Sequence, residues 1–321
     1  PMGAPGYGPA SRPADAAGVR GAGGMSLDRR RFLCVAAAFA AAPRAAHAAR
    51  WTGRAFGAPA RIEIRGPRAA ADAALDDAVA ALRAVETAFS IYDPNGFLAR
   101  LNAAGAARIE SPLIEPLFDR IDTLYVATDG LFDPTIQALW RAYRDDGDVD
   151  AARAALGWTR LRRDGAGVAL APGQALSFNG IAQGFGADQV AAVLRVAGAA
   201  ETLIDVGEQV ALGGPFRLGI VDPVHGHIGG RTLADGAVAT SSPQATLLRG
   251  RPHILHPRDA GAAPRWSTVS VEADDAASAD ALSTALCLAD LDHAERILAR
   301  VRGARRALFV DQAGDVREIR A

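Results

Sequence analysis

Two oxygen-bearing side chains lie four residues apart in A-D-A-L-S-T-A-L, residues 279–286. On a helix this spacing places Asp280 and Thr284 on one face, so that a carboxylate and a hydroxyl point the same way. Hard oxygen ligands of this kind suit Mg²⁺, which keeps water or phosphate oxygens at its other positions. The alternative interpretation is a solvated aspartate and an ordinary helical threonine.

A second candidate is the small-residue cluster L-S-F-N-G-I-A-Q-G-F-G-A-D, residues 176–188, which directly precedes a predicted helix. Here Gly180, Gly184 and Gly186 are predicted to leave room for a phosphate or a flavin beside a helix N-terminus, whose unpaired N–H groups favour an anion. The glycines do not form the G-x-G-x-x-G pattern of a dinucleotide fold. A turn required only for packing is the alternative.

Histidines provide the third candidate. His253 lies in P-H-I-L-H-P-R-D-A-G, residues 252–261, where a predicted strand enters a proline-containing turn. A histidine there can transfer a proton near neutral pH, although a hydrogen-bonded structural histidine is equally compatible with the pattern. His225 and His227 are a weaker candidate metal pair, because no third ligand is near them in the sequence.

Composition excludes several classes of chemistry. All 35 cationic residues are arginines, so a GK[ST] phosphate loop and a Schiff-base lysine are impossible. The two cysteines, Cys34 and Cys287, support neither a disulfide framework nor a zinc site. A formal net charge of -1 gives no reason to expect a nucleic-acid partner.

The elements that must position these residues follow from hydrophobic periodicity. Apolar residues every three or four positions predict helices at 69–89, 113–128, 182–196, 276–289 and 291–301. Short β-type runs predict strands at 60–64, 202–206, 216–221, 237–240, 253–255 and 268–272, and a closing hairpin over 307–319 that turns at 311–314. Strands without regular helical crossovers indicate one α+β domain, residues 50–321, with a largely antiparallel sheet flanked by helices.

The first 48 residues predict export. Residues 25–48 place Arg29, Arg30 and Arg31 before a short apolar run and a small-residue site that ends at Ala48, which resembles a twin-arginine signal peptide. The run is too short for a membrane span. We therefore expect cleavage near Ala48/Ala49 and a periplasmic protein. Residues 1–24, rich in Gly, Pro and Ala, are expected to be disordered or upstream of the true start.

Seven segments, taken in order between Arg54 and Leu288, resemble the FAD:protein FMN transferase (ApbE) family. The stretch F-S-I-Y-D-P-N-G-F-L-A-R-L-N at 89–102 is similar to S-x-Y-x-P-x-S-E-L-x-x-L-N, and L-F-D-P-T-I-Q-A-L-W at 131–140 to F-D-P-T-V-G-P-L. Next, N-G-I-A-Q-G-F-G-A-D at 179–188 is similar to G-G-I-A-K-G-Y-A-V-D, and I-D-V-G-E-Q at 204–209 to V-N-I-G-G-D. Finally, A-V-A-T-S-S at 237–242 resembles A-T-S-G, H-I-L-H-P-R-D-A-G at 253–261 resembles H-I-I-D-P-R-T-G, and A-D-A-L-S-T-A-L is close to A-D-A-L-A-T-A-L.

The resemblance implies an ApbE fold, similar to the T-fold, and Mg²⁺ held by the Gly180 carbonyl with Asp280 and Thr284. It implies FAD as substrate and AMP as product, with transfer of FMN to a threonine hydroxyl of a periplasmic or membrane-anchored acceptor flavoprotein. Asp280 and His253 are the candidate proton acceptors. The implied flavin contacts are Phe56, Tyr92, Asp133, Thr135, Ser177, Gly180, Gln183, Gly184, His253 and Ile254.

Three departures from the family pattern leave other functions open. Gln183 replaces a lysine, His256 an aspartate, and Glu208-Gln209 the Gly-Asp of G-G-D. A FAD pyrophosphatase giving FMN and AMP, or a non-catalytic flavin-binding maturation factor, are the alternatives to a transferase. The N-G-I-A-Q-G and V-G-E patterns also resemble an exported, NosX-like subgroup linked to nitrous-oxide-reductase maturation.

Overall fold

A computed structural model describes residues 47–65, 68–199, 201–259 and 261–321. The predicted signal peptide, up to its last two residues, and the segment before it lie outside the described residues. Within them, no helix is both long and apolar enough to cross a membrane.

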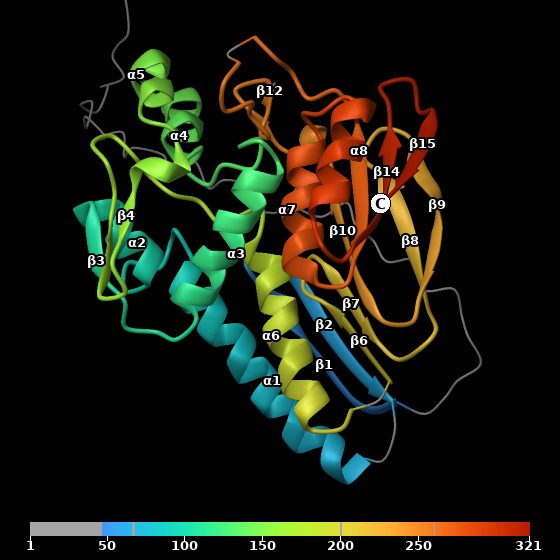
Figure 1. Ribbon diagram of the computed structural model, residues 1–321. Coiled ribbons are helices and arrows are strands. Elements are labelled where there is room, and N and C mark those ends of the chain that lie inside the picture. Colours follow the sequence, from blue (N-terminus) through green and yellow to red (C-terminus); the bar gives the residue numbers. More distant parts are fainter. Residues whose placement is uncertain (1–46, 66–67, 200, 260) are drawn as a thin grey trace, which may run out of the picture.

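One large antiparallel sheet forms the centre of the molecule (Figure 1). Its strands follow the order β1-β2-β6-β7-β10-β13-β14-β15, and every neighbouring pair is antiparallel. The sheet confirms the predicted α+β class with a largely antiparallel sheet. Its strands are β1 (His47–Ala55), β2 (Ala58–Arg65), β6 (Glu201–Asp205), β7 (Gln209–Leu212), β10 (Gly236–Ser241), β13 (Thr268–Ala273), β14 (Ala304–Val310) and β15 (Val316–Arg320).

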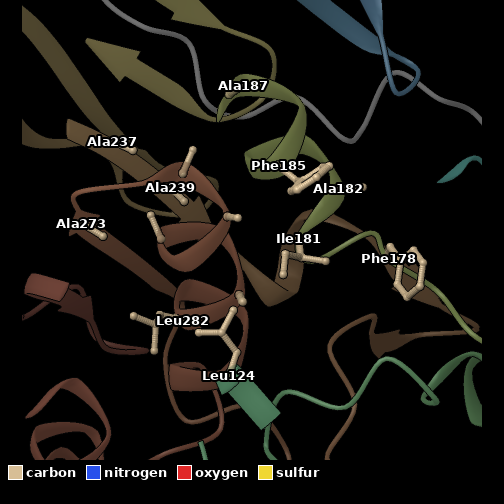
Figure 2. Close-up of a cluster of buried hydrophobic side chains, with 14 of the residues drawn as sticks. Leu124, Phe178, Ile181, Ala182, Phe185, Ala187, Ala237, Ala239, Ala273 and Leu282 are labelled. Atoms are coloured by element: carbon tan, nitrogen blue, oxygen red, sulfur yellow. The ribbon is translucent and has the colours of Figure 1, made fainter. Parts of the chain in front are cut away.

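Helices cover one face of this sheet (Figure 1). They are α1 (Arg68–Phe89), α3 (Ile114–Ala127), α6 (Ala182–Val196), α7 (Ala276–Leu286) and α8 (Leu291–Arg300). Apolar side chains from helices and strands meet in the main core, among them Leu124 of α3, Phe185 of α6, Ala239 of β10 and Leu282 of α7 (Figure 2). Burial of these faces is the main stabilising contribution to the fold.

A hairpin, β8 (Phe216–Asp222) with β9 (Gly226–Leu233), covers part of the opposite face. Phe216 and Leu218 of the hairpin pack with Leu203 of β6 and Val238 of β10 in a second buried cluster. The middle strands of the sheet are therefore covered on both faces. Packing from both sides fixes their backbone, and with it the polar residues that these strands present toward the helices.

The remaining elements lie beside α3 and α7. They are α2 (Phe97–Ala104), α4 (Gln137–Asp145), α5 (Val149–Ala154), a small sheet of β3 (Ala106–Arg108), β5 (Gly167–Ala169) and β4 (Arg162–Arg163), and the pair β11 (Leu247–Leu248) and β12 (Arg251–Pro252).

One predicted strand is wrong. Residues 253–255 are not a strand, because β12 ends at Pro252. The His253 N–H donates to the Thr246 carbonyl at 3.1 Å, one pair beyond the β11–β12 ladder, and residues 253–255 do not continue as a strand. Pro252 has no N–H with which to pair, which limits the strand further.

Candidate active site

Asp280 lies at the centre of the candidate site, on the α7 face that packs against α6. Its side chain is 3% exposed, and Oδ2 accepts a hydrogen bond of 3.1 Å from the Gly184 N–H near the start of α6. Burial raises the pKa of Asp280 to about 7, and the negative charge of Asp188 adds to that rise. An unbalanced negative charge at this position is therefore unfavourable in the folded chain.

The other two predicted metal ligands lie next to each other. Thr284 follows Asp280 by one helical turn, and a Cβ atom at Gly180 would lie only 2.9 Å from Thr284 Oγ1. The same hydroxyl is 3.3 Å from the hydroxyl of Ser241 on β10. The turn before α6 thus lies against the Thr284 hydroxyl.

The donor set fits a hard cation such as Mg²⁺. Carbonyl, hydroxyl and carboxylate oxygens are the atoms that Mg²⁺ prefers. Asp280 forms no ion pair with any arginine in the described part of the chain, so no protein cation already neutralises it. The described residues contain no cluster of three His, Cys, Asp or Glu side chains suited to a metal, which leaves this mixed oxygen set as the candidate.

Two further carboxylates, which the sequence interpretation did not assign to the site, lie close to Asp280. Glu208, between β6 and β7, is 7% exposed and accepts from the Thr240 N–H at 3.2 Å. Burial raises its pKa well above the ordinary value, and Asp280 is the next largest cause. Asp188 of α6 accepts from the N–H groups of Ala276 and Ala277, at 2.8 and 2.9 Å, and so anchors the start of α7.

The only sequence signal for these two carboxylates was their position. Glu208 interrupts an apolar run between two predicted strands, and Asp188 ends the glycine-rich segment. Neither position indicates a site until the sheet places the β6–β7 turn beside α6 and α7.

The side chain of Gln183 points toward the β6–β7 turn. Its Nε2 donates to the Val206 carbonyl at 3.1 Å, and a Cβ atom at Gly207 would lie 2.0 Å from it. Gly207 has φ of +105°, a conformation that favours glycine. The amide that replaces the family lysine therefore joins α6 to the β6–β7 turn.

The expectation that Gly184 and Gly186 leave room for a ligand is wrong. A Cβ atom at Gly184 would lie 2.2 Å from the carbonyl oxygen of Ala276, so this glycine permits close packing of α6 on α7. At Gly186 the nearest atoms belong to the Phe56 ring, at 3.1 Å. Of the three, Gly180 lies beside the Thr284 hydroxyl, and Gly184 contacts Asp280 through its N–H.

His253 is held by backbone carbonyls. Its Nδ1 lies 3.0 Å from the Pro243 oxygen and 3.2 Å from the Thr246 oxygen. Because both partners are acceptors, Nδ1 carries the hydrogen and Nε2 is the basic nitrogen. Burial lowers the pKa of His253 despite these bonds, so the ring is neutral near pH 7.

The remaining predicted flavin contacts fall into two groups. Residues of the first group form hydrogen bonds within the protein. Thr135 is fully buried; its hydroxyl donates to Asp133 Oδ1 at 2.6 Å and accepts from the Gly157 N–H at 2.9 Å. Burial raises the pKa of Asp133. Ser177 donates its N–H to the Pro134 carbonyl at 2.9 Å, which ties the two loops together. These residues shape the loops, and their contact with flavin stays a prediction.

The second group consists of Tyr92, Phe56 and Ile254. Tyr92 is 62% exposed, on the segment after α1, and is accessible to a ligand. Phe56 has φ of +50° and donates its N–H to Glu86 at 2.7 Å. Ile254 is buried at the wall of a hollow whose other residues are Tyr143, Arg153, Arg251, Pro252, Leu255, His256, Asp259, Gly261, Ala262, Ala263 and Pro264. Asp280, Thr284 and Gly180 are not among the residues that line this hollow.

Comparison with known proteins follows the same segments. A sequence profile of the ApbE family matches residues 56–309. A protein named FAD:protein FMN transferase from Rhodobacter capsulatus is 29% identical over 289 residues, which covers 81% of this chain. The chain spans about half of that relative, 55% of its length.

Solved structures share the fold. The ApbE protein of Thermotoga maritima superposes with a TM-score of 0.74 at 22% identity, over 84% of this chain and 96% of that one. The flavinyl transferase ApbE of Pseudomonas stutzeri gives 0.73 at 24% identity, over 85% and 94%. The flavin transferase ApbE of Vibrio cholerae gives 0.69 at 21%, over 85% and 96%. Because the profile covers most of the chain and includes the Gly180, Asp280 and Thr284 segments, the chain belongs to the ApbE family.

Proposed function

We propose that this chain is a FAD:protein FMN transferase, which moves FMN from FAD to a threonine hydroxyl of an acceptor protein and releases AMP. The observation that carries the proposal is that Gly180, about a hundred residues before α7 in sequence, lies against the Thr284 hydroxyl, one helical turn from Asp280. The name of the Rhodobacter capsulatus relative supports the same activity.

In this proposal the Gly180 carbonyl, the Asp280 carboxylate and the Thr284 hydroxyl hold Mg²⁺. The bound cation would neutralise charge on the pyrophosphate of FAD. Asp188 positions α7 by accepting two N–H groups at its start, and Gly184 fixes one Asp280 oxygen with its N–H. These contacts hold the ligands in place before substrate binds, which is how a protein contributes most to phosphoryl transfer.

His253 is the group that we assign to proton transfer. The threonine oxygen of the acceptor forms a bond to the FMN phosphorus, the bond from that phosphorus to the AMP oxygen breaks, and AMP leaves with the electron pair. The hydroxyl proton passes to Nε2 of the neutral His253 ring, whose orientation the Pro243 and Thr246 carbonyls fix.

Incubation with FAD, Mg²⁺ and an acceptor domain, followed by mass spectrometry, tests the activity. Covalent FMN on a threonine of the acceptor is the expected result. Free FMN with AMP would instead identify a FAD pyrophosphatase, and intact FAD a flavin-binding maturation factor. Asp280→Asn should abolish transfer. Asp222→Asn, which alters a buried carboxylate between β8 and β13, is the matched control and should retain it.

We also propose export by the twin-arginine route, with cleavage near Ala48/Ala49 and a periplasmic acceptor. Cleavage there leaves the pairing of β1 with β2 from Ala49 onward, since Ala49 pairs with Ile64. Replacing Arg29, Arg30 and Arg31 by lysine keeps the charge but removes the paired arginines. Wild-type protein should appear in the periplasm with an N-terminus near Ala49, while the triple variant stays uncleaved in the cytoplasm. Mature periplasmic protein from that variant would refute this route.

A further inference from the structure

Glu208 is a buried carboxylate outside the ligand set proposed above. Only 7% of the residue is exposed, and Oε2 accepts from the Thr240 N–H at 3.2 Å. Within the described part of the chain, no arginine forms an ion pair with this side chain. A carboxylate this deeply buried is expensive unless a cation or further donors balance it.

Two pairs of consecutive residues link Glu208 to the ligands. Thr240 binds Glu208 through its N–H, and the next residue, Ser241, places its hydroxyl 3.3 Å from that of Thr284. On the other side Gln183 contacts the turn that carries Glu208, and the next residue, Gly184, donates to Asp280. The turn that carries Glu208 is therefore held between β10 and α6, the two elements that contact Thr284 and Asp280 of α7.

We propose that Glu208 supplies a second carboxylate to the cation site, so that one divalent cation balances Glu208 and Asp280 together. The inference rests on the metal site of the proposed function and extends it to a residue outside the family pattern, which has glycine here. The negative charge of Asp280 acts on the buried Glu208, so the two ionised carboxylates repel each other. A cation with charge two removes that repulsion for both side chains at once.

Calorimetric titration of the full chain with Mn²⁺, used as a probe for Mg²⁺, tests the inference. Glu208→Gln preserves the shape and the acceptor for Thr240 but removes the charge, and it should weaken Mn²⁺ binding at least tenfold. Glu272→Gln is the matched control, because Glu272 of β13 pairs with Arg305 and Arg306. It should bind Mn²⁺ as the wild type does.

Three outcomes separate this inference from the proposed function. If Asp280→Asn loses Mn²⁺ binding while Glu208→Gln keeps wild-type affinity, the metal site stands and the role of Glu208 is refuted. If the wild type binds no Mn²⁺, the metal site and the role of Glu208 both fail, while the transfer assay decides separately whether the chain transfers FMN. If Glu208→Gln does not fold, as circular dichroism would show, Glu208→Asp replaces it: a shortened carboxylate should weaken Mn²⁺ binding severalfold, and unchanged affinity overturns the proposal.

Discussion

Replacing Asp280 by asparagine should stabilise the metal-free protein while it removes activity. The side chain is buried, and its pKa in the folded chain rises to about 7 from an ordinary 3.8. A raised carboxyl pKa means that ionisation opposes folding. The stability that the neutral Asp280 carboxyl contributes is fully present below the ordinary pKa and is lost as the pH rises through about 7. Asparagine stays neutral, and its amide oxygen can still accept from the Gly184 N–H.

The size of the effect follows from the pKa difference. At roughly 1.4 kcal/mol per pKa unit, full ionisation of Asp280 opposes folding by up to about 4 kcal/mol. Between pH 5 and pH 8.5, the advantage of asparagine over aspartate should grow by about 2 to 3 kcal/mol. Urea unfolding of both proteins in EDTA at these two pH values measures the difference. Mg²⁺ at pH 8.5 should then stabilise the wild type and leave Asp280→Asn unchanged.

Asp222→Asn is the control for this experiment. Burial raises the pKa of Asp222, but the Ser267 and Thr268 hydroxyls at 2.6 and 2.7 Å, with two backbone N–H groups, outweigh that effect and lower it. Its contribution to stability is complete above the ordinary pKa and is lost only as the pH falls through the lowered value. The loss in Asp222→Asn should therefore be the same at pH 5 and pH 8.5. A pH-independent difference between Asp280→Asn and the wild type would refute the reasoning about Asp280.

Three other substitutions test contacts in the site. Gly184→Ala places a Cβ atom 2.2 Å from the Ala276 carbonyl, so thermal denaturation should show a loss of about 3 kcal/mol or more; wild-type stability would contradict the packing argument. Gln183→Lys loses the bond to Val206 but restores a cation, and titration of FAD fluorescence should show binding tightened about tenfold, whereas unchanged affinity would mean that an arginine already fills the role. Thr135→Val removes both hydrogen bonds of a buried hydroxyl and should cost about 1–3 kcal/mol of stability and weaken FAD binding; retained FAD affinity would limit Thr135 to shaping its loop.

The longer helices were predicted because their signal is local, whereas the short helices α2, α4 and α5 were missed. The stripe of apolar residues that begins near Ala69 gives α1 (Arg68–Phe89) to within one residue, and α6 (Ala182–Val196) has the predicted bounds. Strand β7 (Gln209–Leu212) was missed because it is only four residues long and buried throughout, so it has no alternation to detect. Its existence depends on pairing with β6 and β10, which no local window contains.

The residues of the candidate site divide in the same way, into those with a local sequence signal and those that only tertiary contacts bring to the site. Asp280 and Thr284 share a helical face by spacing alone, and the structure places Gly180 beside Thr284. Glu208 and Asp188 reach the site only through tertiary contacts, Glu208 through Thr240 of β10 and Asp188 through the start of α7. The glycine cluster was ambiguous because close packing and ligand access both require a missing side chain, and sequence alone does not separate them.

Two departures from the family pattern that are 25 residues apart in sequence are neighbours in space. Gln183, where the pattern has lysine, contacts the β6–β7 turn, and that turn carries Glu208, where the pattern has glycine. One change removes a positive charge and the other adds a negative charge, while Gln209 in place of the family aspartate removes a negative charge next to Glu208. A divalent cation compensates the remaining negative charge without any further substitution. If Glu208 binds the cation as proposed above, the missing lysine is no argument against catalysis, because the cation site has gained a carboxylate ligand.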